Sequence, residues 1–219
     1  MAIPYIGTAL GGHALRVWLL YLSPFWQNSG KRAFFMNLVV GITPSESLRM
    51  ALLDLQSQFW TSDWAPYSYL MLPLCSLGEV THPVVLEELD HALMALRTPH
   101  PITLEPVGFD VFTRRDRITL ELKFQAPTLD HLSVKIGTIA KRAGVKKPQV
   151  RAPLTLPLAT ITTVAPDDVS AWLQLHPATA FEPEVISEIT LFRTWKNSET
   201  TFFIPETDYL LTEYSLPIS

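Results

Sequence analysis

Cysteine is almost absent from this chain, because Cys75 is the single cysteine among 219 residues. One cysteine cannot form an intrachain disulfide, and the six histidines show no Cys or His cluster at metal-ligand spacing. We therefore expect a reducing, cytoplasmic location and neither a bound metal nor another cofactor.

Long apolar runs and phosphate-binding loops are missing as well. No stretch of about 18 apolar residues occurs, so no membrane-spanning helix is expected. No glycine-rich phosphate loop or low-complexity tract is present. The formal net charge is only -4, which argues against a surface devoted to nucleic acid but allows local basic patches.

Apolar residues are plentiful. Hydrophobic residues make up 47% of the chain and charged residues 17%, which is enough for a full core. Residues 1–30 stand apart because Ala14 to Trp26 is apolar and aromatic but lacks the flanks of a signal peptide. We interpret residues 1–30 as an extension that packs on the domain, contacts a partner or comes from an upstream start codon. Residues 31–219 are predicted to form a single domain.

Apolar spacing predicts alternating strands and helices. In the first half, helical spacing follows Thr43-Pro44-Ser45-Glu46. The predicted elements there are a strand at 31–40, this helix, a strand at 68–77, a helix at 83–96 and a hairpin formed by 101–112 and 117–124. Along 117–124 polar and apolar residues alternate, as in a sheet with one solvent-facing side.

The second half repeats this order. Its predicted elements are a helix at 128–143 ended by Gly144, a strand at 153–162, a helix at 166–175 and a closing hairpin formed by 183–195 and 200–211. Helices interleaved with hairpins predict an α+β fold with antiparallel sheets rather than a doubly wound parallel sheet.

Two apolar segments, Tyr69 to Val80 and Arg151 to Thr160, carry the strongest functional signal. They resemble the paired His-x-Thr-x strands of the 2H phosphoesterases, the family of bacterial 2'-5' RNA ligases and RNA 2',3'-cyclic phosphodiesterases. The family motifs typically read HLTLxFLGEV and PHLTLAR. In this alignment Met71 and Pro73 stand at the first His and Thr, Pro153 stands at the second His, and Thr155 keeps the second Thr.

The resemblance implies a bilobal fold in which two pseudo-symmetric lobes with antiparallel sheets flank a central cleft. In active relatives one histidine acts as general base and the other as general acid, while the threonines hold phosphate oxygens. Met71 offers only a weak acceptor, and proline side chains carry no proton to transfer. We therefore expect no catalytic residue at Met71, Pro73 or Pro153. Among the histidines, His100 comes nearest to a motif, but it and Thr103 would lie on opposite sides of an extended strand.

Five residues are candidate ligand contacts for RNA or a nucleotide: Thr155, Arg151, Lys146, Lys147 and Arg115. Each also has a plain structural interpretation. Threonine is a good strand former, lysines near a helix C-terminus favour the helix dipole, and turn tips are usually charged.

The aromatic residues and Cys75 are open to the same two interpretations. Cys75 shares strand register with Met71 and could face the cleft, although a buried inert thiol is favoured. Aromatic rings around the first motif could stack bases, but burial in the core is favoured for Phe25, Trp26, Phe59, Trp60, Trp64, Tyr67 and Tyr69.

The sequence favours a catalytically degenerate 2H phosphoesterase-like protein that serves as a binding or interaction module, with RNA ends or nucleotides as candidate ligands. One alternative is a divergent active RNA 2',3'-cyclic phosphodiesterase that uses other cleft groups. The other is a structural subunit that docks on a protein partner through residues 14–26.

Overall fold

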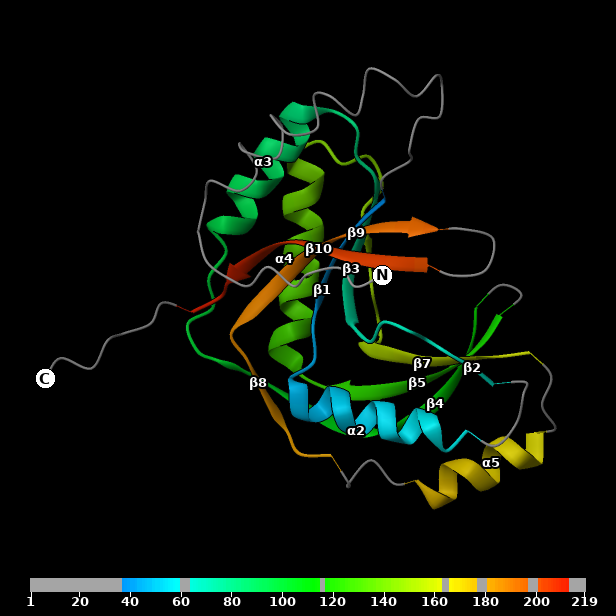
Figure 1. Ribbon diagram of the computed structural model, residues 1–219. Helices are drawn as coiled ribbons and strands as arrows, with labels where there is room; N and C mark the ends of the chain where they lie inside the picture. Colours follow the sequence, from blue (N-terminus) through cyan, green and yellow to red (C-terminus); the bar gives the residue numbers. More distant parts are fainter. Residues whose placement is uncertain are drawn as a thin grey trace, which may run out of the picture. The chain divides into compact units, whose positions relative to one another are not determined.

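The computed structural model describes residues 37–59, 64–114, 117–162, 166–176, 181–196 and 201–212 (Figure 1). The predicted extension at 1–30 and the start of the predicted strand at 31–40 lie outside these ranges, so the proposed division of the chain stays a prediction. Within the described part of the chain, no helix is long and apolar enough to cross a membrane.

The described strands form two five-stranded sheets in which every pair is antiparallel. The first sheet has the order β10-β9-β1-β3-β6 and the second the order β2-β7-β5-β4-β8. The strands of the first sheet are β1 (Asn37–Ile42), β3 (Leu72–Glu79), β6 (Gln149–Val150), β9 (Glu188–Lys196) and β10 (Thr201–Leu210). Those of the second are β2 (Trp64–Pro66), β4 (Ile102–Arg114), β5 (Arg117–Gln125), β7 (Thr155–Ile161) and β8 (Glu184–Ile186). The α+β class with antiparallel sheets is confirmed.

The two sheets exchange short strands. The order β1, α2, β2, β3 in the first half is repeated by β5, α4, β6, β7 in the second half. However, β2 pairs with β7 in the second sheet, and β6 pairs with β3 in the first sheet. Each motif strand is therefore bordered by a strand that belongs to the other half of the repeat.

The helices lie where the apolar spacing places them. They are α2 (Glu46–Ser57), α3 (Pro83–Met94), α4 (Pro127–Arg142) and α5 (Pro166–Leu175). The Ser45 side chain accepts a hydrogen bond from the Leu48 N–H at 3.2 Å, which satisfies one free donor at the start of α2. Gly144 follows α4 with φ at +102°, a conformation in which a side chain would be strained.

The helices pack against the sheets (Figure 1). Helix α4 packs on β3 and β6, and α3 packs beside α4. On the other sheet, the fully buried Trp172 of α5 lies 5.8 Å from Phe59, 5.4 Å from Trp64 and 5.3 Å from Phe109, measured between ring centroids. Trp64 thus belongs to the core and the partly buried Phe59 packs against it, as favoured above. For Tyr67 and Tyr69 that interpretation was wrong, because both are only partly buried. Phe25, Trp26 and Trp60 lie outside the described residues.

The prediction of one continuous strand at 183–195 was wrong. The chain changes sheets at Ser187, because β8 pairs with β4 in the second sheet whereas β9 pairs with β1 in the first. The Ser187 carbonyl accepts a hydrogen bond from the Leu211 N–H at 2.8 Å between the two strands. Both strands are rich in β-forming residues, so the composition gives no sign of the change.

Candidate functional site

The two motif strands share one sequence pattern and one irregularity. Strand β3 carries Leu72-Pro73-Leu74-Cys75-Ser76-Leu77, and β7 carries Leu156-Pro157-Leu158-Ala159-Thr160-Ile161. Opposite β1, the pairing skips Leu74, and opposite β5 it skips Leu158. Each leucine is therefore the extra residue of a β-bulge directly after the proline.

The bulge decides which side chains of β3 face the space between the sheets. One extra residue reverses the alternation of side chains that follow it. Met71, Pro73 and Ser76 line the pocket described below, whereas Cys75 is fully buried on the α4 side of the sheet. A Cβ atom on Gly137 of α4 would lie 3.9 Å from the Cys75 sulfur.

The suggestion that Cys75 faces the cleft was therefore wrong, because the bulge turns it away. Burial raises the pKa of the Cys75 thiol from 9.0 to about 11, and a backbone hydrogen bond at Gln149 opposes this rise only in part. A thiol with a raised pKa and no solvent access is chemically inert, which agrees with the favoured interpretation.

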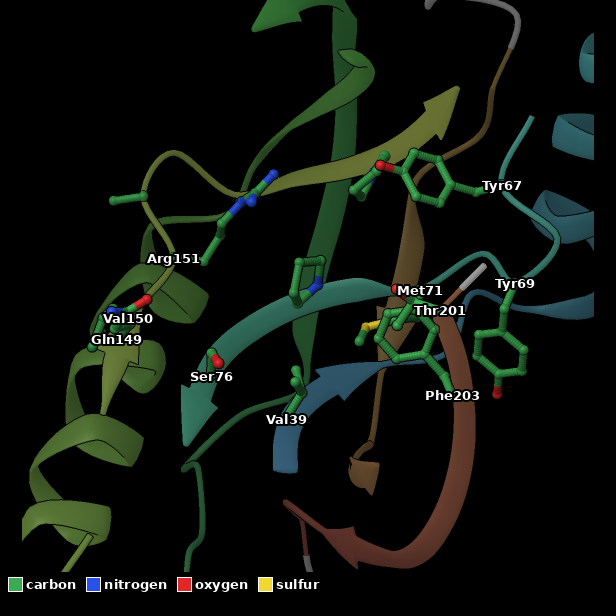
Figure 2. A pocket seen from close by; sticks show the side chains of 13 residues that line it. Val39, Tyr67, Tyr69, Met71, Ser76, Gln149, Val150, Arg151, Thr201 and Phe203 are labelled. Atoms are coloured by element: carbon green, nitrogen blue, oxygen red, sulfur yellow. The ribbon is translucent and has the colours of Figure 1, made fainter. Parts of the chain in front are cut away.

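A pocket of about 400 Å³ lies between the motif strands (Figure 2). Figure 2 shows Tyr67, Tyr69 and Phe203 on one side and Gln149, Val150 and Arg151 on the other. The Tyr69 and Phe203 rings are stacked with centroids 5.9 Å apart. Its lining residues are Val39, Tyr67, Tyr69, Met71, Pro73, Ser76, Gln149, Val150, Arg151, Ala152, Pro157, Thr201 and Phe203.

The connections that enter the two motif strands are also equivalent. From Pro66 at the end of β2 to Met71 the chain advances five residues, as it does from Val150 at the end of β6 to Thr155. Aligned on the bulges, Thr155 is the counterpart of Met71 and Pro157 is the counterpart of Pro73. The second motif is thus displaced by two residues from the predicted register, which had placed Pro153 opposite Met71.

The pocket residue Arg151 belongs to a buried polar cluster on the second sheet. Glu121 of β5 is 1% exposed, and both of its carboxylate oxygens accept hydrogen bonds. The Thr119 hydroxyl donates to Oε1 at 2.7 Å, and Arg151 Nη2 donates to Oε2 at 2.6 Å. The Thr155 hydroxyl also donates to Oε2 and accepts from Arg151 Nη2 at 3.0 Å.

The solvent-facing side predicted for residues 117–124 was therefore wrong at its centre, where Thr119 is 6% exposed and Glu121 1%. The loop that carries Arg151 bonds to this part of β5 and removes it from water. Sequence reasoning missed Glu121 altogether. Nothing in the sequence distinguishes it, because Glu121 occupies one of the polar positions of the alternating segment 117–124.

Comparison with known proteins places this geometry in a known architecture. No protein-family model and no curated protein sequence matches the chain. Among solved structures, Escherichia coli LigT in its apo form superposes with a TM-score of 0.66 at 19% identity, covering 81% of this chain and 98% of LigT. The chain has the two-lobed fold of LigT. The fold expected from the 2H phosphoesterase resemblance is confirmed.

Two further structures agree with this assignment. A protein described as a phosphoesterase gives a TM-score of 0.66 at 19% identity, over 81% of this chain and 99% of its own. TT0787 of Thermus thermophilus gives 0.55 at 20% identity, over 80% and 98%. LigT itself has been crystallised with 3'-AMP, phosphate and ATP.

In this LigT-like fold, two of the five predicted ligand contacts lie together. Arg151 and Thr155 meet at Glu121, although Thr155 is fully buried and does not line the pocket. Lys146 and Lys147 are exposed between α4 and β6 and do not line it either. Arg115 lies outside the described residues.

No histidine of the described part of the chain lines the pocket, and neither does any aspartate or glutamate. His176 packs on Trp172 with ring centroids 4.3 Å apart, and its Nδ1 lies 2.9 Å from the Trp172 carbonyl oxygen. His13 lies outside the described residues. Within those residues, no group of three or more His, Cys, Asp or Glu side chains could hold a metal ion.

Proposed function

We propose that this chain is a catalytically degenerate 2H phosphoesterase-like protein that binds a ligand in its cleft without turning it over. The observation that carries the proposal is the pair of counterpart positions Met71 and Thr155, neither of which is a histidine. The same conclusion holds in the register that places Pro153 at the second position.

The chemistry of cyclic phosphate hydrolysis supports an inactive site. A general base and a general acid must lie on opposite sides of the phosphorus with pKa values near the working pH. Met71 has no proton to give, the Thr155 hydroxyl already donates to Glu121, and Pro73 and Pro157 have no polar side-chain atom. Loss of one such group typically costs about 10²- to 10⁴-fold in rate.

Ligand binding is supported by the size and lining of the pocket. Its volume of about 400 Å³ falls in the usual range for small-molecule sites. Tyr67, Tyr69 and Phe203 offer flat apolar surfaces on which a base can stack. Because LigT has been crystallised with 3'-AMP and ATP, nucleotides and RNA ends are the ligands to test first.

The test is hydrolysis of a short RNA ending in a 2',3'-cyclic phosphate, measured beside binding of unmodified RNA and nucleosides to the same preparation. We expect no turnover and saturable binding that Tyr69→Ala weakens. Lys123→Ala serves as the control, because Lys123 lies outside the pocket in an exposed pair with Asp110. Turnover that a pocket substitution abolishes would establish the divergent-enzyme alternative instead. The docking role of residues 14–26 stays a prediction.

A further inference from the structure

Arg151 is the one charged residue among the described residues that line the pocket. Its side chain is 19% exposed, and its guanidinium contacts the carboxylate of Glu121, whose side chain is 1% exposed. The nitrogen to oxygen distance is 2.6 Å. The cation that would attract an anionic ligand to the pocket is thus already paired within the protein.

Arg151 and Thr155 hold the Glu121 carboxylate as they would hold a bound anion. Oxygen Oε2 of Glu121 receives hydrogen bonds from both the Arg151 guanidinium and the Thr155 hydroxyl. Guanidinium and hydroxyl groups are the donors that proteins use for phosphate oxygens. Glu121 therefore occupies donors of the type that a phosphate would need.

A phosphate that approached Arg151 would meet this buried negative charge at close range. Like charges repel strongly where water is excluded. Separation of Arg151 from Glu121 would also leave a buried carboxylate without its cation, which is unfavourable. An uncharged ligand meets neither obstacle.

We propose that Glu121 sets the charge preference of the pocket, so that it selects a nucleoside or an RNA end with free hydroxyls over a phosphate-bearing end. This inference rests on the ligand-binding function proposed above and names the class of ligand. Glu121 acts through Arg151 and is therefore a specificity-determining residue that does not itself line the pocket.

The remaining lining residues suit an uncharged ring. The stacked pair of Tyr69 and Phe203 provides a flat face. Ser76, Gln149 and Thr201 are uncharged and carry donors and acceptors that can bind the edge of a base or a ribose hydroxyl.

The test compares adenosine, 3'-AMP and inorganic phosphate by titration calorimetry on the full chain and on Glu121→Gln. We expect the unaltered protein to bind adenosine at least as tightly as 3'-AMP. In Glu121→Gln, affinity for 3'-AMP should rise about tenfold or more while adenosine binding changes little, because a guanidinium that no longer faces a carboxylate can form a charge-assisted bond to phosphate. Asp110→Asn is the matched control, because it removes one negative charge from the neighbouring strand at an exposed pair with Lys123.

Each outcome decides a different point. Tighter binding of 3'-AMP than of adenosine by the unaltered protein, unchanged in Glu121→Gln, would overturn the role of Glu121 and leave the binding function standing. Failure of both proteins to bind any probe would overturn both proposals. If only Glu121→Gln bound 3'-AMP, the role of Glu121 would be supported and nucleotide binding by the native pocket rejected.

A second variant covers the case in which Glu121→Gln does not fold. The double variant Glu121→Gln with Arg151→Met removes both charges together and leaves no unpaired ion. We expect it to bind adenosine and to show no preference for 3'-AMP. A marked preference for 3'-AMP in this variant would contradict the inference, since no cation of the pair remains.

Discussion

Tyr67 and Arg151 are counterparts in the internal repeat. The backbone N–H of Tyr67 donates to the Leu158 carbonyl at 2.8 Å, and that of Arg151 donates to the Leu74 carbonyl at the same distance. Both acceptors are the bulged leucines of the opposite motif strands. The backbone of the pocket is thus symmetric, whereas its chemistry is not, because one half contributes a phenol ring and the other a paired guanidinium.

Removal of Arg151 should destabilise the protein. In Arg151→Ala the Glu121 carboxylate stays buried without its cation, and such losses typically cost about 3–5 kcal/mol. Urea unfolding measures the change in free energy. Lys123→Ala is the control, because its pair with Asp110 is exposed and should cost less than about 1 kcal/mol. Equal costs for the two substitutions would contradict the buried-pair argument.

Cys75 should resist thiol reagents in the folded protein. Burial raises the pKa of its thiol to about 11, so little thiolate exists at pH 8, and the sulfur has no access to solvent. Because the chain has one cysteine, reaction with a disulfide reagent reports on this position alone. We expect rapid labelling in urea and labelling at least about tenfold slower without it. Similar rates in both conditions would place Cys75 at the surface.

Gly137→Ala should loosen the contact between α4 and β6. A Cβ atom at this position would lie 2.6 Å from Val150 Cγ2, and a β-branched side chain has little freedom to move away. We expect a net loss of about 1–2 kcal/mol in unfolding free energy, because overpacking outweighs the gain in helix propensity. Adding Val150→Ala should recover part of this loss. If the free-energy losses of Gly137→Ala and Val150→Ala, each measured alone, simply add in the double variant, the two side chains do not clash.

Tyr209→Phe should make the protein less sensitive to alkali. Burial raises the pKa of the Tyr209 phenol well above its ordinary value of 10.0, and its hydrogen bond to Asp90 at 2.7 Å adds to the rise. A folded-state pKa above the unfolded value gives stability that is complete below about pH 10 and is lost as the pH rises further. The variant should lose about 1 kcal/mol at pH 7 and decline less steeply between pH 9 and 11. Denaturant unfolding at each pH measures the unfolding free energy of both proteins. Parallel declines of the two free energies with pH would exclude this role.

Local signals predicted most of the fold. The helix start at 43–46, the apolar spacing of α2 and the alternation along 117–124 each depend on neighbours in sequence, so the corresponding helix and hairpin were predicted within a few residues. The arrangement of two lobes came from the family resemblance of the segments Tyr69 to Val80 and Arg151 to Thr160.

Long-range pairing explains what sequence reasoning missed. Strands β2 and β6 have three and two residues, too few to show any alternation, and each exists only because a strand of the other half pairs with it. The bulge at Leu74 likewise depends on the register with β1, so simple alternation could not tell that Cys75 and Met71 lie on opposite faces. The burial of Glu121 depends on Arg151, which lies 30 residues away.

The exchange of β2 and β6 between the sheets limits how the pocket can move. A hinge that swung one sheet away from the other would have to break the pairing of β6 with β3, the pairing of β2 with β7, and the backbone bonds of Tyr67 and Arg151. We therefore expect the cleft to keep its shape when a ligand binds. Ligand binding then requires little ordering of the protein. Selectivity depends on how well a ligand fits the existing pocket rather than on closure of the pocket around the ligand.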